Sequence, residues 1–129
     1  MAEDFQMVAE AMLMAFAESV AAADVDGLAE LFWLDDQRFA AIGDAIAEPF
    51  GRAGVDGLLA SLRAQGQPGD PMSWRDVRAH RLGPDVGYVI ARQGRGDTWA
   101  WATLILLKKG HEWGLLHCSF AVPLRRGQG

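Results

Sequence analysis

The sequence holds few cysteines, basic residues and long hydrophobic runs, and each shortage excludes a class of protein. Its only cysteine, Cys118, cannot form an internal disulfide and lies among residues typical of a buried strand, as expected of a protein from a reducing compartment. The 12 lysines and arginines are scattered along the chain against 17 acidic residues, a formal net charge of −5. Nucleic acid is therefore not an expected partner.

Membrane and metal signals are missing as well. No apolar run approaches the roughly 18 residues of a membrane span, and residues 1–6 are acidic where a signal peptide is basic, so we expect a cytoplasmic protein that does not bind membranes. The three histidines fall in three separate segments without HxH or CxxC spacing, and no metal site is expected. The glycines of 94–97 lack the lysine of a phosphate loop, and no cofactor is expected either.

What the sequence does contain is enough patterned hydrophobic residues for one core, so residues 1–129 are predicted to form a single domain. From residue 5, apolar positions recur at spacings of three and four, which predicts a first helix. Asp24 is a suitable N-cap for a second helix, and residues 51–54 open a third, which the proline- and glycine-rich segment 66–73 ends. The expected inward positions of the three helices are Val8, Met12, Phe16 and Val20, then Val25, Leu28, Leu31 and Phe32, then Val55, Leu58, Leu59 and Leu62.

A change of periodicity near residue 74 predicts a sheet. A short strand is expected at 38–43, with residues 45–50 as its partner. Three helices followed by antiparallel strands form the α+β layout, in which the helices cover one face of a curved sheet. The four later strands, separated by short turn sequences, are expected at 74–82, 86–93, 98–109 and 113–122.

Alternation along the strands gives the first functional hypothesis. If the faces that carry Trp101 and His117 coincide, they form an aromatic wall with an imidazole and two hydroxyls, which is typical of a ligand pocket. The sets expected to share a face are Trp113, Leu115, His117 and Ser119 in the last strand, Trp99, Trp101, Thr103, Ile105 and Leu107 in the strand before it, and Trp74, Asp76, Arg78 and His80 in the first of the four.

His117 has two interpretations at this point. Because imidazole titrates near neutrality, His117 is a candidate proton carrier, and Asp36 is a candidate general base at the mouth of the pocket. A lone histidine in a strand is nevertheless more often structural than catalytic, and paired acids after a helix are usually solvated. The tryptophans build either a subunit interface or a ligand cavity, and composition does not choose between them.

Three stretches resemble the nuclear-transport-factor-2-like superfamily (NTF2-like), and within it the SnoaL-like and ketosteroid-isomerase-like proteins. They are ADVDGLAELF (23–32), IGDAIAEPFGRAGVDGLLASL (42–62) and WATLILLKKGHEWGLLHCSFAVP (101–123). The resemblance covers most of the chain. It implies a cone-shaped α+β barrel, in which three N-terminal helices pack on a curved antiparallel sheet of four to six strands around a cavity, and a homodimer formed through the outer sheet face.

The same resemblance limits the chemistry, because the superfamily contains several classes of enzyme as well as non-enzymatic domains. Ketosteroid isomerases place a tyrosine in the first helix and an aspartate near residues 40–41, where this chain has methionines and two alanines. The usual mechanism of those isomerases is therefore not expected here. In many SnoaL-like relatives an arginine takes the position of Trp101. The family positions that carry over are Thr103, Trp113 and His117.

The leading hypothesis is a SnoaL-like protein whose largely apolar cavity binds a small hydrophobic or aromatic molecule. If it is an enzyme, it transfers protons as an isomerase, cyclase or dehydratase, with His117 as acid or base and Asp36 assisting. The alternative is a non-enzymatic module, in which the tryptophan-rich sheet is a dimer or partner surface and side chains fill the cavity. The residues expected to line the cavity are Tyr88, Trp99, Trp101, Thr103 and Ser119.

Overall fold

The computed structural model describes residues 4–43, 46–64, 72–95, 98–121 and 124–125. It contains helices α1 (Phe5–Ala21), α2 (Val25–Glu30) and α3 (Gly51–Arg63), as the sequence predicted. Asp24 caps α2 by accepting a hydrogen bond from the backbone N–H of Gly27 at 2.9 Å. The segment expected to end α3 lies mostly outside the described residues.

The buried stripe of α1 differs from the prediction by about one position at its N-terminal end. Phe16 and Val20 are buried as expected, but Ala9 and Leu13 take the central positions, and Val8 and Met12 are only partly buried. In α3, the side chains that were expected to face inward are all buried. These are Val55, Leu58, Leu59 and Leu62.

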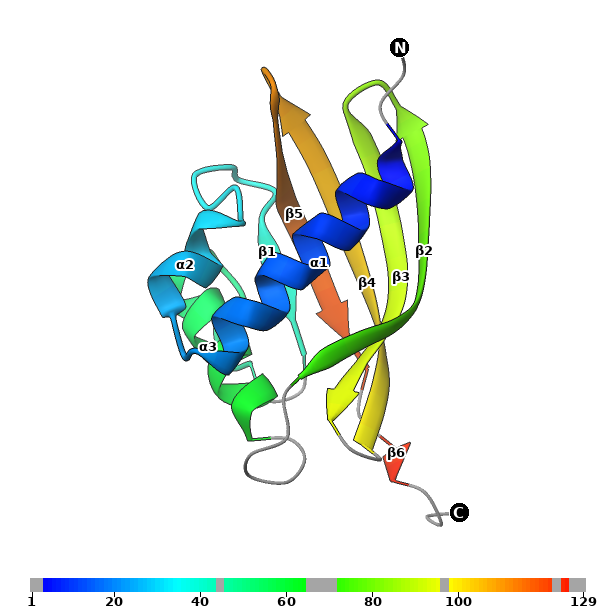
Figure 1. The fold of residues 1–129 in the computed structure, drawn as a ribbon. Helices are drawn as coiled ribbons and strands as arrows, with labels where there is room; N and C mark the ends of the chain where they lie inside the picture. The colour runs from blue at the N-terminus through cyan, green and yellow to red at the C-terminus, as the bar shows by residue number, and fades with distance from the viewer. Residues whose placement is uncertain (1–3, 44–45, 65–71, 96–97, 122–123, 126–129) are drawn as a thin grey trace.

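Four long strands form an antiparallel meander at the predicted positions (Figure 1). The short strand β1 lies at the edge beside β5, and it runs parallel to β5 rather than pairing with residues 45–50 as predicted. One backbone hydrogen bond, from Ala41 N–H to Pro49 O, joins β1 to that segment. A two-residue strand, β6, also pairs with β4. The strands are β1 (Ala40–Ile42), β2 (Ser73–Gly83), β3 (Val86–Arg95), β4 (Thr98–Lys109), β5 (Glu112–Phe120) and β6 (Leu124–Arg125).

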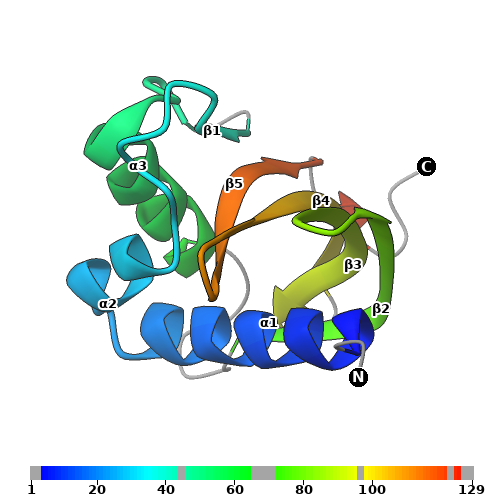
Figure 2. The same ribbon diagram turned by 90° about the horizontal axis from the view of Figure 1, so that it is seen from above.

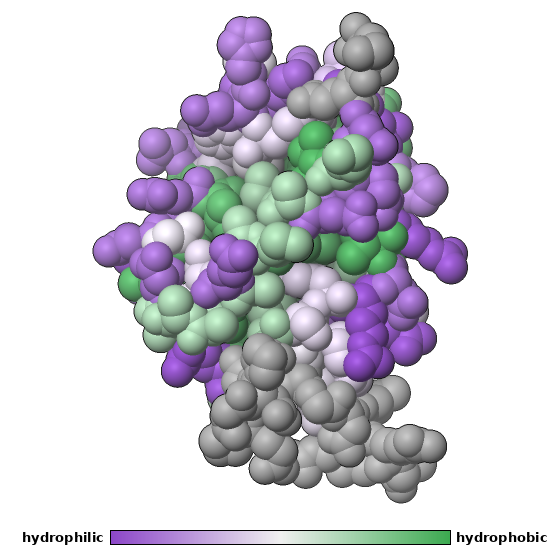
Figure 3. Space-filling model, in the orientation of Figure 1, coloured by the Kyte–Doolittle hydropathy of each residue, from purple (hydrophilic) through white to green (hydrophobic). Residues whose placement is uncertain are grey.

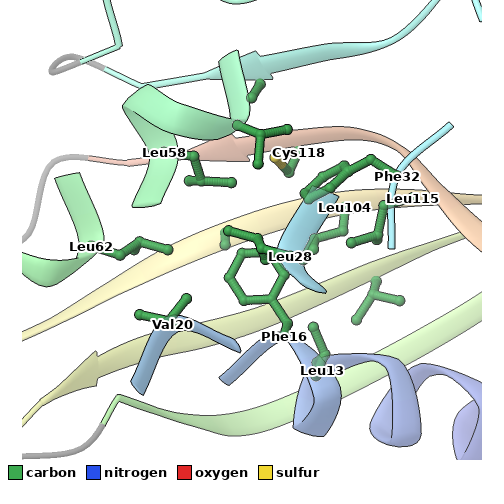
Figure 4. Packing of buried hydrophobic residues seen from close by; sticks show 14 of the residues in the cluster. Leu13, Phe16, Val20, Leu28, Phe32, Leu58, Leu62, Leu104, Leu115 and Cys118 are labelled. Atoms are coloured by element: carbon green, nitrogen blue, oxygen red, sulfur yellow. The ribbon is translucent and has the colours of Figure 1, made fainter. Parts of the chain in front are cut away.

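The sheet curves around α1, and α2 and α3 lie beside its β1–β5 edge (Figure 2). The predicted α+β class and the packing of helices on one face of a curved sheet are confirmed, although the sheet is mixed and open rather than wholly antiparallel. Side chains from the three helices meet those of β4 and β5 in one hydrophobic core (Figure 4). Phe16 lies near its centre and contacts Phe32, Trp74 and Phe120 at ring-centroid distances of 5.4 to 6.4 Å.

A register shift in β5 changes which side chains share a face. Leu106 pairs with Leu115, but the preceding residue of β4, Ile105, pairs with His117, so β5 has one extra residue at this point. Leu115 and Cys118 both face the core, and His117 faces the other side of the sheet. The prediction that Trp113 and Leu115 share a face with His117 and Ser119 is therefore wrong, because it assumed unbroken alternation.

A second shift, in β2, has the same kind of effect. The pairing of β2 with β3 changes between Arg75 and Arg78, and Asp76 there has a backbone φ of 54°. Trp74 consequently packs in the core against Phe16, whereas His80 lies beside Tyr88 on the opposite side, with ring centroids 5.2 Å apart. The prediction that Trp74 shares a face with His80 is wrong for this reason.

Candidate functional site

The predicted cavity residues do come together, but on the sheet face that points away from the helices. Tyr88 and His117 both pair with Ile105, and Thr103 pairs with Ser119, so these side chains lie in neighbouring rows. Trp99 and Trp101 alternate with the inward-facing Ala100 and Ala102 and belong to the same side. We call this surface the outer face, and its members include Ile42, Tyr88, Ile90, Arg92, Trp101, Thr103, Ile105, His117 and Ser119.

The outer face exposes large apolar side chains. Trp101 is 46% exposed, Ile42 43% and Ile90 36%. These residues come from β4, β1 and β3, so they are distributed across the sheet rather than along one strand. A sheet face with this composition resembles a contact surface more than a solvated one.

Arginine side chains hold the tryptophan rings in place on this face. The guanidinium of Arg92 lies over the ring of Trp101, 4.6 Å from its centroid, and that of Arg75 lies 3.7 Å from the centroid of Trp99. Arg92 Nε is also 3.5 Å from a carboxylate oxygen of Asp76. These contacts restrict the rotamers of the two indoles and put positive charge at the β2–β3 side of the outer face.

His117 is half-buried in a largely apolar environment. Ile105 is its cross-strand neighbour in β4, and Ala40 is its neighbour in β1. Burial lowers the pKa of the imidazole, because a partly desolvated ring disfavours the charged form. His117 is therefore mainly neutral near pH 7, and within the described part of the chain no hydrogen bond reaches its ring.

Asp36 has partners of its own. Its carboxylate accepts hydrogen bonds from Arg38 at 2.8 and 2.9 Å and forms an ion pair with Lys109 at 3.0 Å. These bonds hold the pKa of Asp36 well below its usual range, so the group is a poor proton acceptor. Lys109 lies four residues beyond Ile105, the partner of His117, so the structure does not bring the two predicted catalytic residues together.

The helix side of the sheet has a hollow that the sequence did not point to. It has a volume of about 280 Å³ and lies between α1 and the first half of β2. The α1 positions follow the i, i+3, i+4, i+7 spacing of one helix flank, but the inward position of Trp74 depends on the β2 shift. We call it the α1–β2 groove; it is lined by Glu10, Leu13, Met14, Ala17, Met72, Ser73, Trp74 and Val77.

Hydrophobic side chains gather over α1 on this side of the molecule, with hydrophilic ones on both flanks (Figure 3). Met14, at the lip of the groove, is 65% exposed. Glu10 has no ion-pair partner among the described residues. Within the same residues, no group of three or more histidine, cysteine or acidic side chains is placed to hold a metal, and no helix is long and apolar enough to cross a membrane.

Comparisons with known proteins identify the fold. No family model matches the sequence, and no curated protein matches it. An uncharacterised protein with a cystatin-like fold from Caulobacter vibrioides superposes with a TM-score of 0.72 at 15% identity, covering 96% of this chain and 92% of that one.

Two further solved structures carry functional names. A protein from Thiobacillus denitrificans, provisionally assigned as a calcium/calmodulin-dependent protein kinase type II association domain, has a TM-score of 0.63 at 23% identity, with 90% and 94% of the two chains covered. A provisionally assigned scytalone dehydratase from Novosphingobium aromaticivorans has a TM-score of 0.64 at 13% identity, with 94% and 92% covered. Other matching structures are described as NTF2-like. The chain therefore has the cystatin-like, or NTF2-like, fold that its sequence resemblance implied.

Proposed function

We propose that the chain is an association module that pairs with a second copy of itself through the outer face. The observation that carries this proposal is the exposure of Trp101, Ile42 and Ile90 on one sheet face. Protein interfaces are enriched in aromatic side chains and arginine and depleted of charge at their centre. The outer face follows this arrangement, since Thr103, Ile105 and neutral His117 lie centrally and the arginines lie to one side.

The solved structures support this proposal through one printed name. The Thiobacillus denitrificans protein is described as an association domain, and it covers nearly the whole of this chain. The same fold can thus serve assembly instead of catalysis. We extend this assembly function to the present chain because its predicted cavity residues lie on the outer face, where a second copy can contact them.

Sedimentation equilibrium of the wild-type chain and two variants tests the proposal. Trp101→Glu puts a charge at the most exposed apolar position of the outer face, and the chain is expected to become monomeric. Phe50→Glu is the matched control, because Phe50 is 62% exposed at the start of α3 and is not one of the outer-face residues. Phe50→Glu is expected to remain dimeric. A monomeric wild-type chain, or a Trp101→Glu variant that stays dimeric, would refute the proposal.

The α1–β2 groove favours a second function, the binding of a small hydrophobic molecule. Its volume of about 280 Å³ is near the lower end for ligand pockets, and most of its lining is apolar. This second proposal covers binding and not proton transfer. His117 lies on the opposite sheet face, and the carboxylate of Asp36 is bound to Arg38 and Lys109.

A neutral fluorescent dye such as Nile red is the probe for the groove. Ala17→Phe fills the groove from α1 and is expected to abolish dye binding. Ala11→Phe adds the same side chain to an exposed α1 position that does not line the groove. This variant is expected to bind the dye as the wild type does. Equal binding by both variants would exclude the groove as the site. Circular dichroism checks that both variants keep their helix content.

A further inference from the structure

Among the residues that the structure describes, Glu10 is the one charged side chain that lines the α1–β2 groove. It lies on α1 one turn before Leu13 and Met14, so its carboxylate adjoins the apolar lining. Among the described residues its carboxylate takes part in no ion pair or hydrogen bond. An unpaired carboxylate beside an apolar hollow attracts a cationic head group and repels an anionic one.

The opposite wall of the groove comes from β2 and includes the indole of Trp74. Indole is the aromatic side chain that attracts cations most strongly, through the negative potential of its ring face. Met14 and Met72 supply flexible, polarisable contacts that adapt to an apolar body. The groove thus combines a carboxylate, an indole and thioethers in a space of about 280 Å³, which is large enough for a single-ring molecule with a short side chain.

We infer that the α1–β2 groove selects an apolar organic cation, a molecule with an ammonium head group and a hydrophobic body. The ammonium lies near Glu10, and the body lies against Leu13, Met72 and Val77. This inference rests on the proposed binding function of the groove and specifies the class of its ligand. The net charge of −5 adds a weaker, long-range attraction for the same class.

Three probes that share a phenyl group but differ in the charge of their polar group test this selectivity. They are phenylethylamine, phenylethanol and phenylacetate, which are positive, neutral and negative at pH 7. Each is titrated into chain labelled with ¹³C at the methionine methyl groups. Met14 and Met72 report on the groove, and Met7 is the control methyl, because it is exposed on α1 and does not line the groove.

We expect phenylethylamine to shift the Met14 and Met72 methyl signals with an affinity about tenfold higher than that of phenylethanol, and phenylacetate to bind most weakly. In Glu10→Gln the preference for the amine over the alcohol is expected to disappear. In Glu18→Gln, which removes an exposed α1 charge outside the groove, the preference is expected to persist.

The outcomes separate the ligand class from the existence of the site. Equal affinities for the amine and the alcohol would overturn the cation inference and leave the groove as a binding site. Loss of the preference in Glu18→Gln as well as in Glu10→Gln would also overturn it, because general attraction to an acidic chain would then be the cause. If no probe shifts Met14 or Met72, both the inference and the proposed binding function of the groove are wrong.

Discussion

The register shift in β5 predicts very different costs for truncating two residues that simple alternation would place side by side. Leu115 is fully buried in the core, so Leu115→Ala leaves a cavity and is expected to lower the free energy of unfolding by about 3 kcal/mol. His117 lies on the outer face, so His117→Ala is expected to cost about 0.5 kcal/mol. Unbroken alternation would give both residues the same environment and similar costs.

Urea unfolding, monitored by circular dichroism, measures this difference in the free energy of unfolding. With a denaturant slope of about 1.5 kcal/mol per molar, the loss at Leu115 lowers the urea midpoint by about 2 M, while the loss at His117 shifts it by about 0.3 M. Both substitutions are made in the Trp101→Glu background, so that association does not add to the measured stability. Similar midpoints for the two variants would refute the assigned register.

Asp36, His117 and Gly114 each give a further testable prediction. Asp36→Asn is expected to lower the free energy of unfolding at pH 7, and this loss is expected to shrink as the pH falls below about 4. The pKa of Asp36 is depressed because its ion pairs stabilise the fold only while the carboxylate is charged. Urea unfolding at several pH values measures this effect. The wild-type chain is expected to lose stability below about pH 6.5, because the lowered pKa of His117 makes its protonation favour the unfolded chain. His117→Gln is expected to lose less stability over the same pH range. If the variant and the wild type show the same dependence of stability on pH, this prediction is wrong. Gly114→Ala is expected to cost about 1 to 3 kcal/mol, because an added Cβ would lie 2.7 Å from the Trp33 ring and displace the Trp33 Nε1–H bond to Leu107 O; an unchanged melting temperature would argue against that contact.

The strand order from β2 to β5 was predictable from the sequence, because short turns between consecutive strands set it. Pro84 and Asp85 form one turn, and Gly110 adopts a φ of 63° in another, a conformation that suits glycine. The parallel pairing of β1 with β5 was not predictable from the sequence in the same way. It joins Ala40 to His117, which are far apart in the sequence, and depends on how α2 and α3 pack.

The candidate sites were harder to predict, because they depend on single-residue shifts. Nothing in the string GLLHC indicates that Leu116 is the extra residue, yet that one residue puts His117 on the opposite face from Leu115. The grouping of Tyr88, Trp101 and Thr103 was predictable, because β3 and β4 pair without a shift. Which face the helices cover was not predictable, since both sides of β4 carry apolar residues.

The central claim is that the outer face associates with a second copy, and the isoleucines of the chain provide a direct measurement. Three of the four isoleucines, Ile42, Ile90 and Ile105, belong to the outer face, and Ile46 is buried elsewhere in the core. Methyl-labelled isoleucine spectra are recorded across a dilution series. The signals of the three outer-face residues are expected to shift with concentration while that of Ile46 stays constant. A dilution series in which sedimentation shows association but these three signals do not move would contradict the account.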